Sequence, residues 1–349
     1  MTLPLSVLDL VPLGSSSDEP GRSGAALRSS LDLATEADRL GYTRYWFAEH
    51  HNMGTIASTT PEIMIALAAE RTSRIHLGSG GVMLPNHAPL KVAETFKMLE
   101  ALHPGRIDLG IGRAPGTDPA TALELRGSRE ALHADDFPAQ LVRLLEYGGR
   151  ETGVTYDARF GKPPGVAAIP LDVTLPPIWL LGSSDYSAHL SAALGVGFGF
   201  AAHFSDMPPE APMHAYRSEF TPSAALATPH AILTLSVICA PTEDEASRLI
   251  SSLLVAFARM RTGQRAVLLP PEQALAYPFS PAELAVVEAI RGRHIIGPPD
   301  KVKAQIEALA AATKADEIMV SAFIYGHEER VRSYILLAEA FGLPREAAA

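Results

Sequence analysis

The chain has 349 residues, of which 47% are hydrophobic and 19% charged, enough apolar sequence for a sizeable buried core. It carries 39 acidic and 29 basic residues, and the formal net charge of −10 argues against nucleic acids and anionic membranes as partners. No basic leader precedes an apolar run and no apolar run reaches ~18 residues, so we expect no signal peptide, no transmembrane helix and a cytoplasmic location.

Strands and helices are predicted to alternate along the first half of the chain. We expect strands at 3–10, 42–48, 75–84 and 106–111. Helices with apolar residues at helical spacing are predicted at 25–40, 63–72 and 90–102, and Gly41 ends the first of them. Four strand-then-helix units within about a hundred residues are typical of a parallel α/β fold.

The second half continues the alternation less regularly. Strands are predicted at 178–182, 197–201, 230–239 and 317–320, with helices at 137–147, 186–194, 243–260, 300–312 and 329–341. Eight strands alternating with helices favour a single (β/α)8 TIM barrel over residues 1–349 rather than an open sheet. Turn-rich insertions are expected at 148–177 and 263–293, and the prolines of the second indicate a mobile excursion. The single cysteine, Cys239, excludes a disulfide and is interpreted as a small core residue.

The most informative run, residues 48–52, follows an aromatic strand and contains Glu49, His50 and His51. Such side chains are rarely buried without partners, and at the C-terminal end of a barrel strand they are typical of an active site. Glu49 and His51 have the spacing to share a metal, but further ligands are missing, so we expect no metal site. A histidine that gives or takes a proton fits better, with Glu49 orienting it or balancing its charge.

The strand at 106–111 predicts an open space inside the barrel. Its side chains alternate, so Asp108, Gly110 and Gly112 share the face opposite to Ile107, Leu109 and Ile111. If this face points inward, the two glycines leave room for a flat ligand near the top of the barrel. Arg106 and Asp108 are then expected to form a buried ion pair near its floor.

Two further segments indicate ligand binding at the same end of the barrel. Arg113 ends the fourth strand, where a guanidinium suits a phosphate, although a surface salt bridge would use the same residue type. Ser183 and Ser184 precede the helix at 186–194, whose N-terminus also favours an anion. The adjacent glycines Gly80 and Gly81 permit close approach of a ligand, or a simple bulge.

Three segments in this order resemble the bacterial luciferase-like flavin monooxygenases, and most closely their alkanal-monooxygenase-like subgroup. They read AEHHN at 48–52, GSGGVMLPNH at 78–87 and PGRIDLGIGRAPGTD at 104–118. The resemblance implies a (β/α)8 barrel that binds reduced FMN and uses dioxygen to oxygenate a small organic substrate such as an aldehyde. NAD(P)H would be the ultimate electron donor, directly or through a separate flavin reductase.

The resemblance also assigns roles to individual residues. It makes His50 the catalytic histidine, with Glu49 beside it, and places a non-prolyl cis peptide between Gly80 and Gly81 against the flavin ring. Gly112 belongs to the flavin site and stands where light-emitting members have a reactive cysteine, so light emission is not implied. The expected phosphate contacts are Arg113, Ser183, Ser184 and Tyr186. The family's dimers imply a homodimer built on helices that here include residues 63–72.

Two alternatives remain open at this point. The same barrel could bind a deazaflavin (F420) and transfer a hydride without oxygen, although the double histidine speaks against this. It could also be a flavin-binding protein without turnover. No Gly-x-Gly-x-x-Gly follows a predicted strand, so we expect no separate dinucleotide-binding domain.

Overall fold

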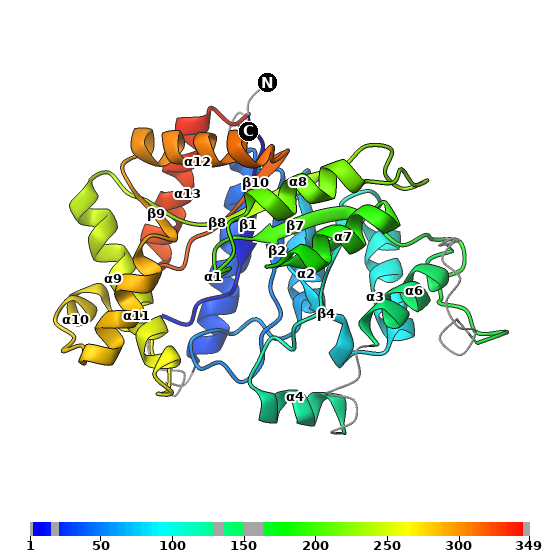
Figure 1. Ribbon diagram of the computed structural model, residues 1–349, viewed down its shortest axis with the longest axis horizontal. Coiled ribbons are helices and arrows are strands. Elements are labelled where there is room, and N and C mark those ends of the chain that lie inside the picture. Colours follow the sequence, from blue (N-terminus) through cyan, green and yellow to red (C-terminus); the bar gives the residue numbers. More distant parts are fainter. Residues whose placement is uncertain (1–2, 15–20, 129–135, 150–162, 345–349) are drawn as a thin grey trace.

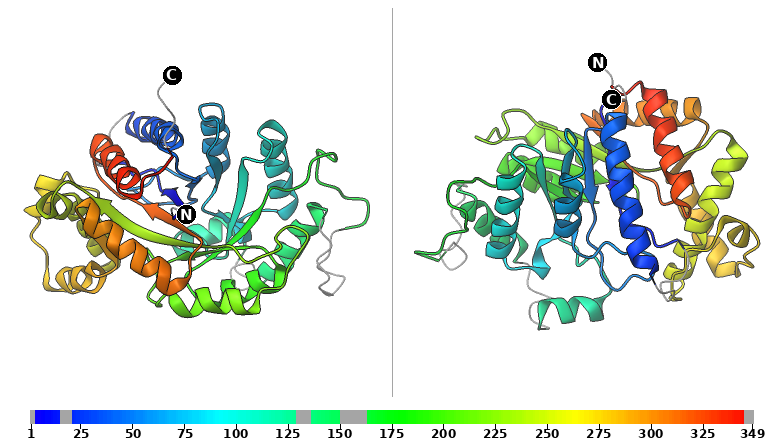
Figure 2. Two further views of the ribbon diagram at one scale, coloured as in Figure 1. Left: turned by 90° about the horizontal axis from the view of Figure 1, so that it is seen from above. Right: turned by 180° about the vertical axis from the view of Figure 1, so that it is seen from behind.

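The computed structural model describes residues 3–14, 21–128, 136–149 and 163–344. Eight parallel strands close into a barrel that the helices surround (Figures 1 and 2), which confirms the predicted (β/α)8 architecture. Closure depends on β8, which pairs with β7 on one side and with β10 on the other. Around the barrel the strands are β10 (Glu317–Ser321), β1 (Leu5–Asp9), β2 (Arg44–Phe47), β3 (His76–Ser79), β5 (Ile107–Gly112), β6 (Ile178–Gly182), β7 (Gly197–Ala201) and β8 (Ala231–Cys239).

The helices begin and end where local signals place them. Gly41, with a φ of 84°, ends the first helix in a left-handed conformation that suits glycine. Thr242 caps α9 by accepting a hydrogen bond from the Glu245 amide at 3.2 Å. The helices are α1 (Arg22–Leu40), α2 (Pro61–Ala69), α3 (Pro89–Leu102), α4 (Pro119–Arg126), α6 (Phe137–Tyr147), α7 (Asp185–Leu194), α8 (Glu210–Glu219), α9 (Glu243–Arg261), α10 (Pro271–Leu275), α11 (Pro281–Arg291), α12 (Pro299–Thr313) and α13 (His327–Phe341), with a short 3-10 turn at Leu84–Asn86.

The alternation along β5 separates two buried clusters. Ile107, Leu109 and Ile111 face outward and join the large core between the barrel and its helices. A smaller cluster fills the barrel interior and includes Trp46 and Trp179; it comprises Leu8, Trp46, Ala48, Trp179, Ile232 and Met319. The inward direction predicted for Asp108 is confirmed, because its carboxylate accepts hydrogen bonds from both tryptophans of this cluster.

The ion pair predicted between Arg106 and Asp108 is wrong. Arg44 pairs with Asp108 at 2.8 Å and with Glu317 at 3.1 Å, forming a buried network at the floor of the barrel. Arg106 precedes β5 and points outward, where it donates to the Ala69 carbonyl at 2.9 Å. Arg106 lies outside the regular strand, so the alternation that governs Asp108 does not extend to it.

The structure differs most from the predicted elements in the two insertions and at the ends of the strands. The third predicted strand is divided into β3 and a two-residue β4 (Val82–Met83) that pairs with β5. The segment 263–293 contains α10 and α11, because Pro271 and Pro281 occupy first-turn helical positions rather than breaking a loop. It leads into an extra strand, β9 (His294–Gly297), beside the outer end of β8. Of the segment 148–177, residues 150–162 lie outside the described residues, and the remainder contains neither helix nor strand.

Besides α10 and α11, the helices α4 and α8 were not expected from the sequence. Cys239 is buried at the end of β8, as predicted. Among the described helices, none is both long and apolar enough to cross a membrane.

Candidate functional site

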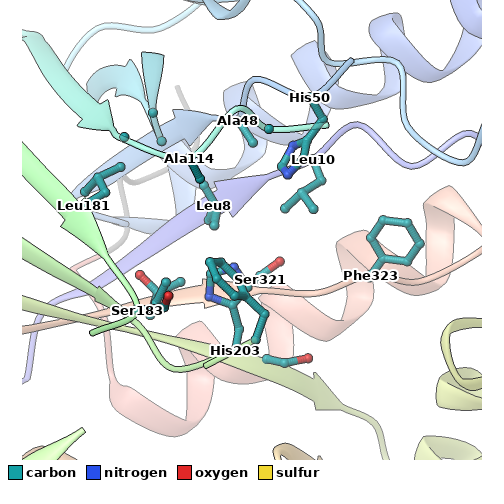
Figure 3. Close-up of a pocket in the computed structure, with 18 of the residues that line it drawn as sticks. Leu8, Leu10, Ala48, His50, Ala114, Leu181, Ser183, His203, Ser321 and Phe323 are labelled. Carbon is teal, nitrogen blue, oxygen red and sulfur yellow. The ribbon is translucent and has the colours of Figure 1, made fainter. Parts of the chain in front are cut away.

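A cavity of about 450 Å³ opens at the C-terminal ends of the barrel strands (Figure 3). This volume falls within the range of small-molecule and cofactor sites. One half, here called the glycine half, is lined by Gly80 and Gly81 between β3 and β4, Gly112 on β5, Gly182 on β6 and Gly199 on β7. The other, the histidine half, is lined by His203 after β7, Ser236 on β8, His294 on β9, Ser321 on β10 and the inner side of α9.

His50 lies between the two halves, three residues beyond the end of β2. Its backbone amide donates to the Ser58 carbonyl at 2.8 Å, which fixes the chain at this point. The half-buried side chain lines the cavity, and its Nδ1 is enclosed with no partner among the described residues. Burial lowers the pKa of His50 to about 4, despite the opposing charge of Glu49. The imidazole is therefore neutral near pH 7 and free to donate or accept one hydrogen bond in the cavity.

Glu49 is buried and is held by other residues than His50. Its Oε1 accepts from His51 Nε2 and from His87 Nε2, each at 2.9 Å, and its Oε2 accepts from the Met83 amide at 3.0 Å. Burial raises the pKa of Glu49, but the hydrogen bonds from His87, His51 and Met83 outweigh burial and lower it overall. Glu49 therefore acts on His50 through its charge, and on the site by tying β2 to β4.

The glycines of the site serve close packing more than open space. The peptide between Gly80 and Gly81 is cis, as the resemblance implied. A Cβ on Gly81 would lie 2.8 Å from Leu181 Cδ1, and one on Gly110 only 2.0 Å from the Ser79 carbonyl oxygen. Gly112 does line the cavity, whereas Gly110 lies beneath the β3 backbone, so the expectation that both glycines leave room for a ligand holds for Gly112 alone.

The predicted phosphate contacts come together at one edge of the glycine half. Arg113, Ser183 and Ser184 all line the cavity. The guanidinium carbon of Arg113 lies 4.2 Å from the centre of the Tyr186 ring, in a cation–π contact that holds the charge beside the N-terminus of α7. Ser184 is the N-cap residue of α7, yet its side chain makes no capping hydrogen bond. These positions, together with the first-turn amides, form an edge suited to an anionic group.

The histidine half of the cavity was not predicted from the sequence. His203 is half-buried, and desolvation together with the field of His50 lowers its pKa to about 3, although a backbone contact with Thr234 opposes the shift. His294 donates to or accepts from Ser236 Oγ at 2.7 Å, and burial lowers its pKa to about 4. Single histidines between apolar segments gave no spacing signal, and only barrel closure brings the two together.

The charges around the cavity are few. Its described lining includes two guanidinium groups, Arg113 and Arg261, and no carboxylate. The described residues contain no group of three His, Cys, Asp or Glu side chains arranged to hold a metal ion. The absence of a metal site stays a prediction. The Glu49–His51 pair that could have chelated a metal is instead hydrogen-bonded to itself and to His87.

Comparison with known proteins agrees with this geometry. Residues 6–317 match the family model described as luciferase-like monooxygenase. A protein named luciferase-like monooxygenase from Escherichia coli (strain K12) is 43% identical over 338 residues, 96% of each chain. The N-acetyl-S-alkylcysteine monooxygenase of Bacillus subtilis (strain 168) is 32% identical and covers 96% of this chain and 97% of its own.

The solved structures show the same likeness in three dimensions. The structure of apo-MsnO8 superposes with a TM-score of 0.86 at 36% identity and covers 99% of both chains. Two structures below 25% identity share the fold alone. They are an oxygenating constituent of 3,6-diketocamphane monooxygenase in complex with FMN, with a TM-score of 0.69, and an F420-dependent secondary alcohol dehydrogenase, with a TM-score of 0.65.

Proposed function

The chain belongs to the luciferase-like monooxygenase family, and from this premise we propose that it is an FMN-dependent monooxygenase. The proposed reaction uses reduced FMN and dioxygen to oxygenate a small organic substrate such as an aldehyde. The observation that carries the proposal is a cavity with a glycine-lined wall, an anion-binding edge at Arg113, and an unpartnered neutral imidazole at His50.

The residues present fit a flavin. Gly80, Gly81 and Gly112 line the cavity without side chains, so a planar ring can approach their backbone. Arg113, Ser183 and Ser184 are placed for a phosphate at the same wall. Bound in reduced form, the flavin would supply the two electrons that activate dioxygen. A flavin-containing structure of the same fold supports this choice of cofactor.

The side chains of this protein would then position the bound substrate and transfer protons. His50, neutral near pH 7, lines the cavity and can give or take a proton there through its imidazole. Glu49 favours a proton on the ring electrostatically, because its negative charge raises the pKa of His50 against the effect of burial. Apolar residues such as Phe257 and Phe323 line the cavity and make this part of its wall unfavourable for water.

Hydride transfer from a deazaflavin is the second candidate, since an F420-dependent dehydrogenase shares the fold. Titration of the protein with FMN and with F420, followed by oxygen uptake across aldehydes, alkanes and cyclic ketones, separates the two. We expect tight binding of FMN and substrate-dependent oxygen uptake. Tight binding of F420 alone would overturn the proposal, and FMN binding without any substrate-dependent uptake would indicate a flavin-binding protein that lacks turnover.

The role of His50 has a separate test. The His50→Ala variant should bind FMN as the parent does and lose at least a hundredfold in substrate-dependent turnover, as expected for a proton-transfer group. His189→Ala, a change of an exposed histidine on α7, is the matched control and should leave turnover unchanged. Normal turnover by His50→Ala would remove His50 from the mechanism.

The electron supply and the assembly complete the proposal. We propose that NAD(P)H reduces the flavin, directly or through a separate reductase, in the cytoplasm, and that two copies of the chain form a homodimer. Ile63 and Leu67 of α2 are 59% and 47% exposed, and Met98 and Leu102 of the neighbouring α3 are 57% and 67% exposed. Each pair lies four residues apart, so the side chains share one face of their helix and form an apolar surface that a second copy would cover.

A further inference from the structure

The cavity contains two imidazoles on opposite sides of the barrel. His50 follows β2 and His203 follows β7, and these strands are four places apart in a closed ring of eight. Strands so related face each other across the barrel, and Figure 3 shows both histidine side chains directed into the space between. His203 is therefore placed to contact the same bound molecule as His50, from the other side.

His203 is held in place by its backbone and by the packing of its ring. The backbone amide donates to the Thr234 carbonyl at 3.1 Å, and the ring packs edge-on against Phe204 with centroids 4.7 Å apart. Its Nδ1 is buried and has no hydrogen-bond partner among the described residues. Because protein atoms enclose Nδ1, a hydrogen bond from a molecule in the cavity has to be made at the other ring nitrogen, Nε2. His294 differs, because Ser236 already engages its Nδ1.

The charges around His203 restrict what it can bind. The pKa of His203 is lowered by burial, so the ring is neutral near pH 7 and offers one donor and one acceptor. The described residues that line this half include no carboxylate to pair with a buried cation. The guanidinium group among the described residues of this half is that of Arg261, an exposed side chain at the C-terminal end of α9. A charged group held next to His203 would remain unpaired and costly to bury.

The remainder of the histidine half is apolar. Leu253, Phe257 and Met260 of α9 line it together with Phe323 beyond β10. We propose that His203 is a substrate-contacting residue, which hydrogen-bonds an uncharged polar group of a substrate whose apolar body lies against α9. That the bound molecule is a substrate rests on the proposed function, whereas its chemical class, an uncharged polar group on an apolar body, follows from the residues that line the cavity.

Two small ligands that differ by one hydroxyl test this inference. Binding of 2-phenylethanol and of ethylbenzene to the full-length chain is measured by ligand-observed NMR titration, first without flavin and then with saturating FMN. In His203→Phe the ring is retained and the hydrogen-bonding nitrogens are lost. We expect the affinity for 2-phenylethanol to fall about tenfold, the effect of one buried hydrogen bond, and that for ethylbenzene to change less than about twofold.

Matched variants separate the polar contact from packing. Phe257→Ala removes apolar wall and should weaken both ligands by the same factor. His203→Asn retains a donor and an acceptor and should recover most of the affinity for the alcohol, while circular dichroism verifies that each variant is folded. Equal losses for the two ligands in His203→Phe, no loss for the alcohol, or no binding of either ligand to the parent would overturn the inference.

A flavin titration distinguishes the two possible sources of the hydrogen-bonding group. We expect His203→Phe to bind FMN with the affinity of the parent, and saturating FMN to leave the alcohol bound. Loss of FMN affinity in His203→Phe would assign the residue to the cofactor instead and overturn the substrate contact. Because the ligand titrations need neither turnover nor oxygen, failure of the monooxygenase proposal would leave their outcome readable.

Discussion

Replacement of Gly110 by alanine offers the sharpest test of the barrel packing. The sequence alone suggests that this inward glycine leaves open space, which a methyl group would fill at little cost. In the structure the added Cβ would lie 2.0 Å from the Ser79 carbonyl oxygen, whereas an ordinary contact begins at 3.4 Å. The neighbouring strand β3 would have to move by more than an ångström, and its Ser79 hydroxyl also donates to the Gly110 carbonyl at 2.8 Å.

The size of the loss in the free energy of unfolding depends on which atom the added Cβ would contact. Overpacking against flexible side chains costs about 1–3 kcal/mol, and a backbone carbonyl in a closed barrel cannot turn away, so we expect at least about 3 kcal/mol for Gly110→Ala. Gly112→Ala is the matched control on the same strand and the same face. Its Cβ would meet Met83 Sδ at 2.8 Å, a flexible side chain that can move, and the loss of unfolded-state entropy offsets part of the cost. We expect a change within about 1 kcal/mol.

Urea unfolding followed by tryptophan fluorescence measures both variants, because Trp46 and Trp179 lie inside the barrel beside Asp108. With a slope of about 3 kcal/mol per molar urea, the midpoint of Gly110→Ala should fall by at least ~1 M. The midpoint of Gly112→Ala should stay near that of the parent. Equal midpoints for Gly110→Ala and the parent would show that β3 and β5 are not in this contact and would refute the reasoning.

Three further changes address the anion edge, the buried carboxylate and the assembly. Arg113→Ala should weaken FMN binding by about 10–100-fold in a fluorescence titration, the value of a charge-assisted hydrogen bond to phosphate; an unchanged affinity would exclude the assigned phosphate site. The lowered pKa of Glu49 means that its charged form stabilises the fold above pH ~4.3, and the raised pKa of His87 means that its charged form does so below pH ~6.5. Both charged forms are present near pH ~5.5, so Glu49→Gln should lower the free energy of unfolding in urea more at pH ~5.5 than at pH ~9. Leu102→Lys should yield a monomer by light scattering if α3 forms the dimer, while Leu275→Lys, equally apolar and exposed on α10, should not change the mass.

The barrel could be predicted because its signals are local and repeated. Apolar strands alternate with amphipathic helices, and the period-two pattern of β5 correctly separates Ile107, Leu109 and Ile111 from Asp108. Much of the glycine half of the cavity could also be predicted, since Gly80, Gly81 and Gly112 lie in two continuous segments, 78–87 and 104–118. Arg113 and Ser183 needed only the rule that the carboxyl ends of parallel strands meet at one edge.

Polar pairings inside the barrel could not be predicted in the same way. Arg106 is the sequence neighbour of Asp108 by two residues, yet the partner is Arg44 from a strand two places away in the ring. Whether an arginine at a strand end turns inward depends on where the regular strand begins, and such boundaries are the least certain part of any pattern. The prolines at 271 and 281 misled for a related reason, because proline both interrupts a helix and begins one.

The histidine half shows the limit most clearly, because its polar groups come from positions 203, 236, 294 and 321. Each of these residues alone is unremarkable in sequence: a lone histidine near apolar residues is ordinary, and serine is common at strand ends. Their meaning depends on β8, whose first half closes the barrel against β10 and whose outer half carries β9 and His294. The same closure puts His203 opposite His50, so the chemistry of this half is set by the ring of strands and not by any one of them.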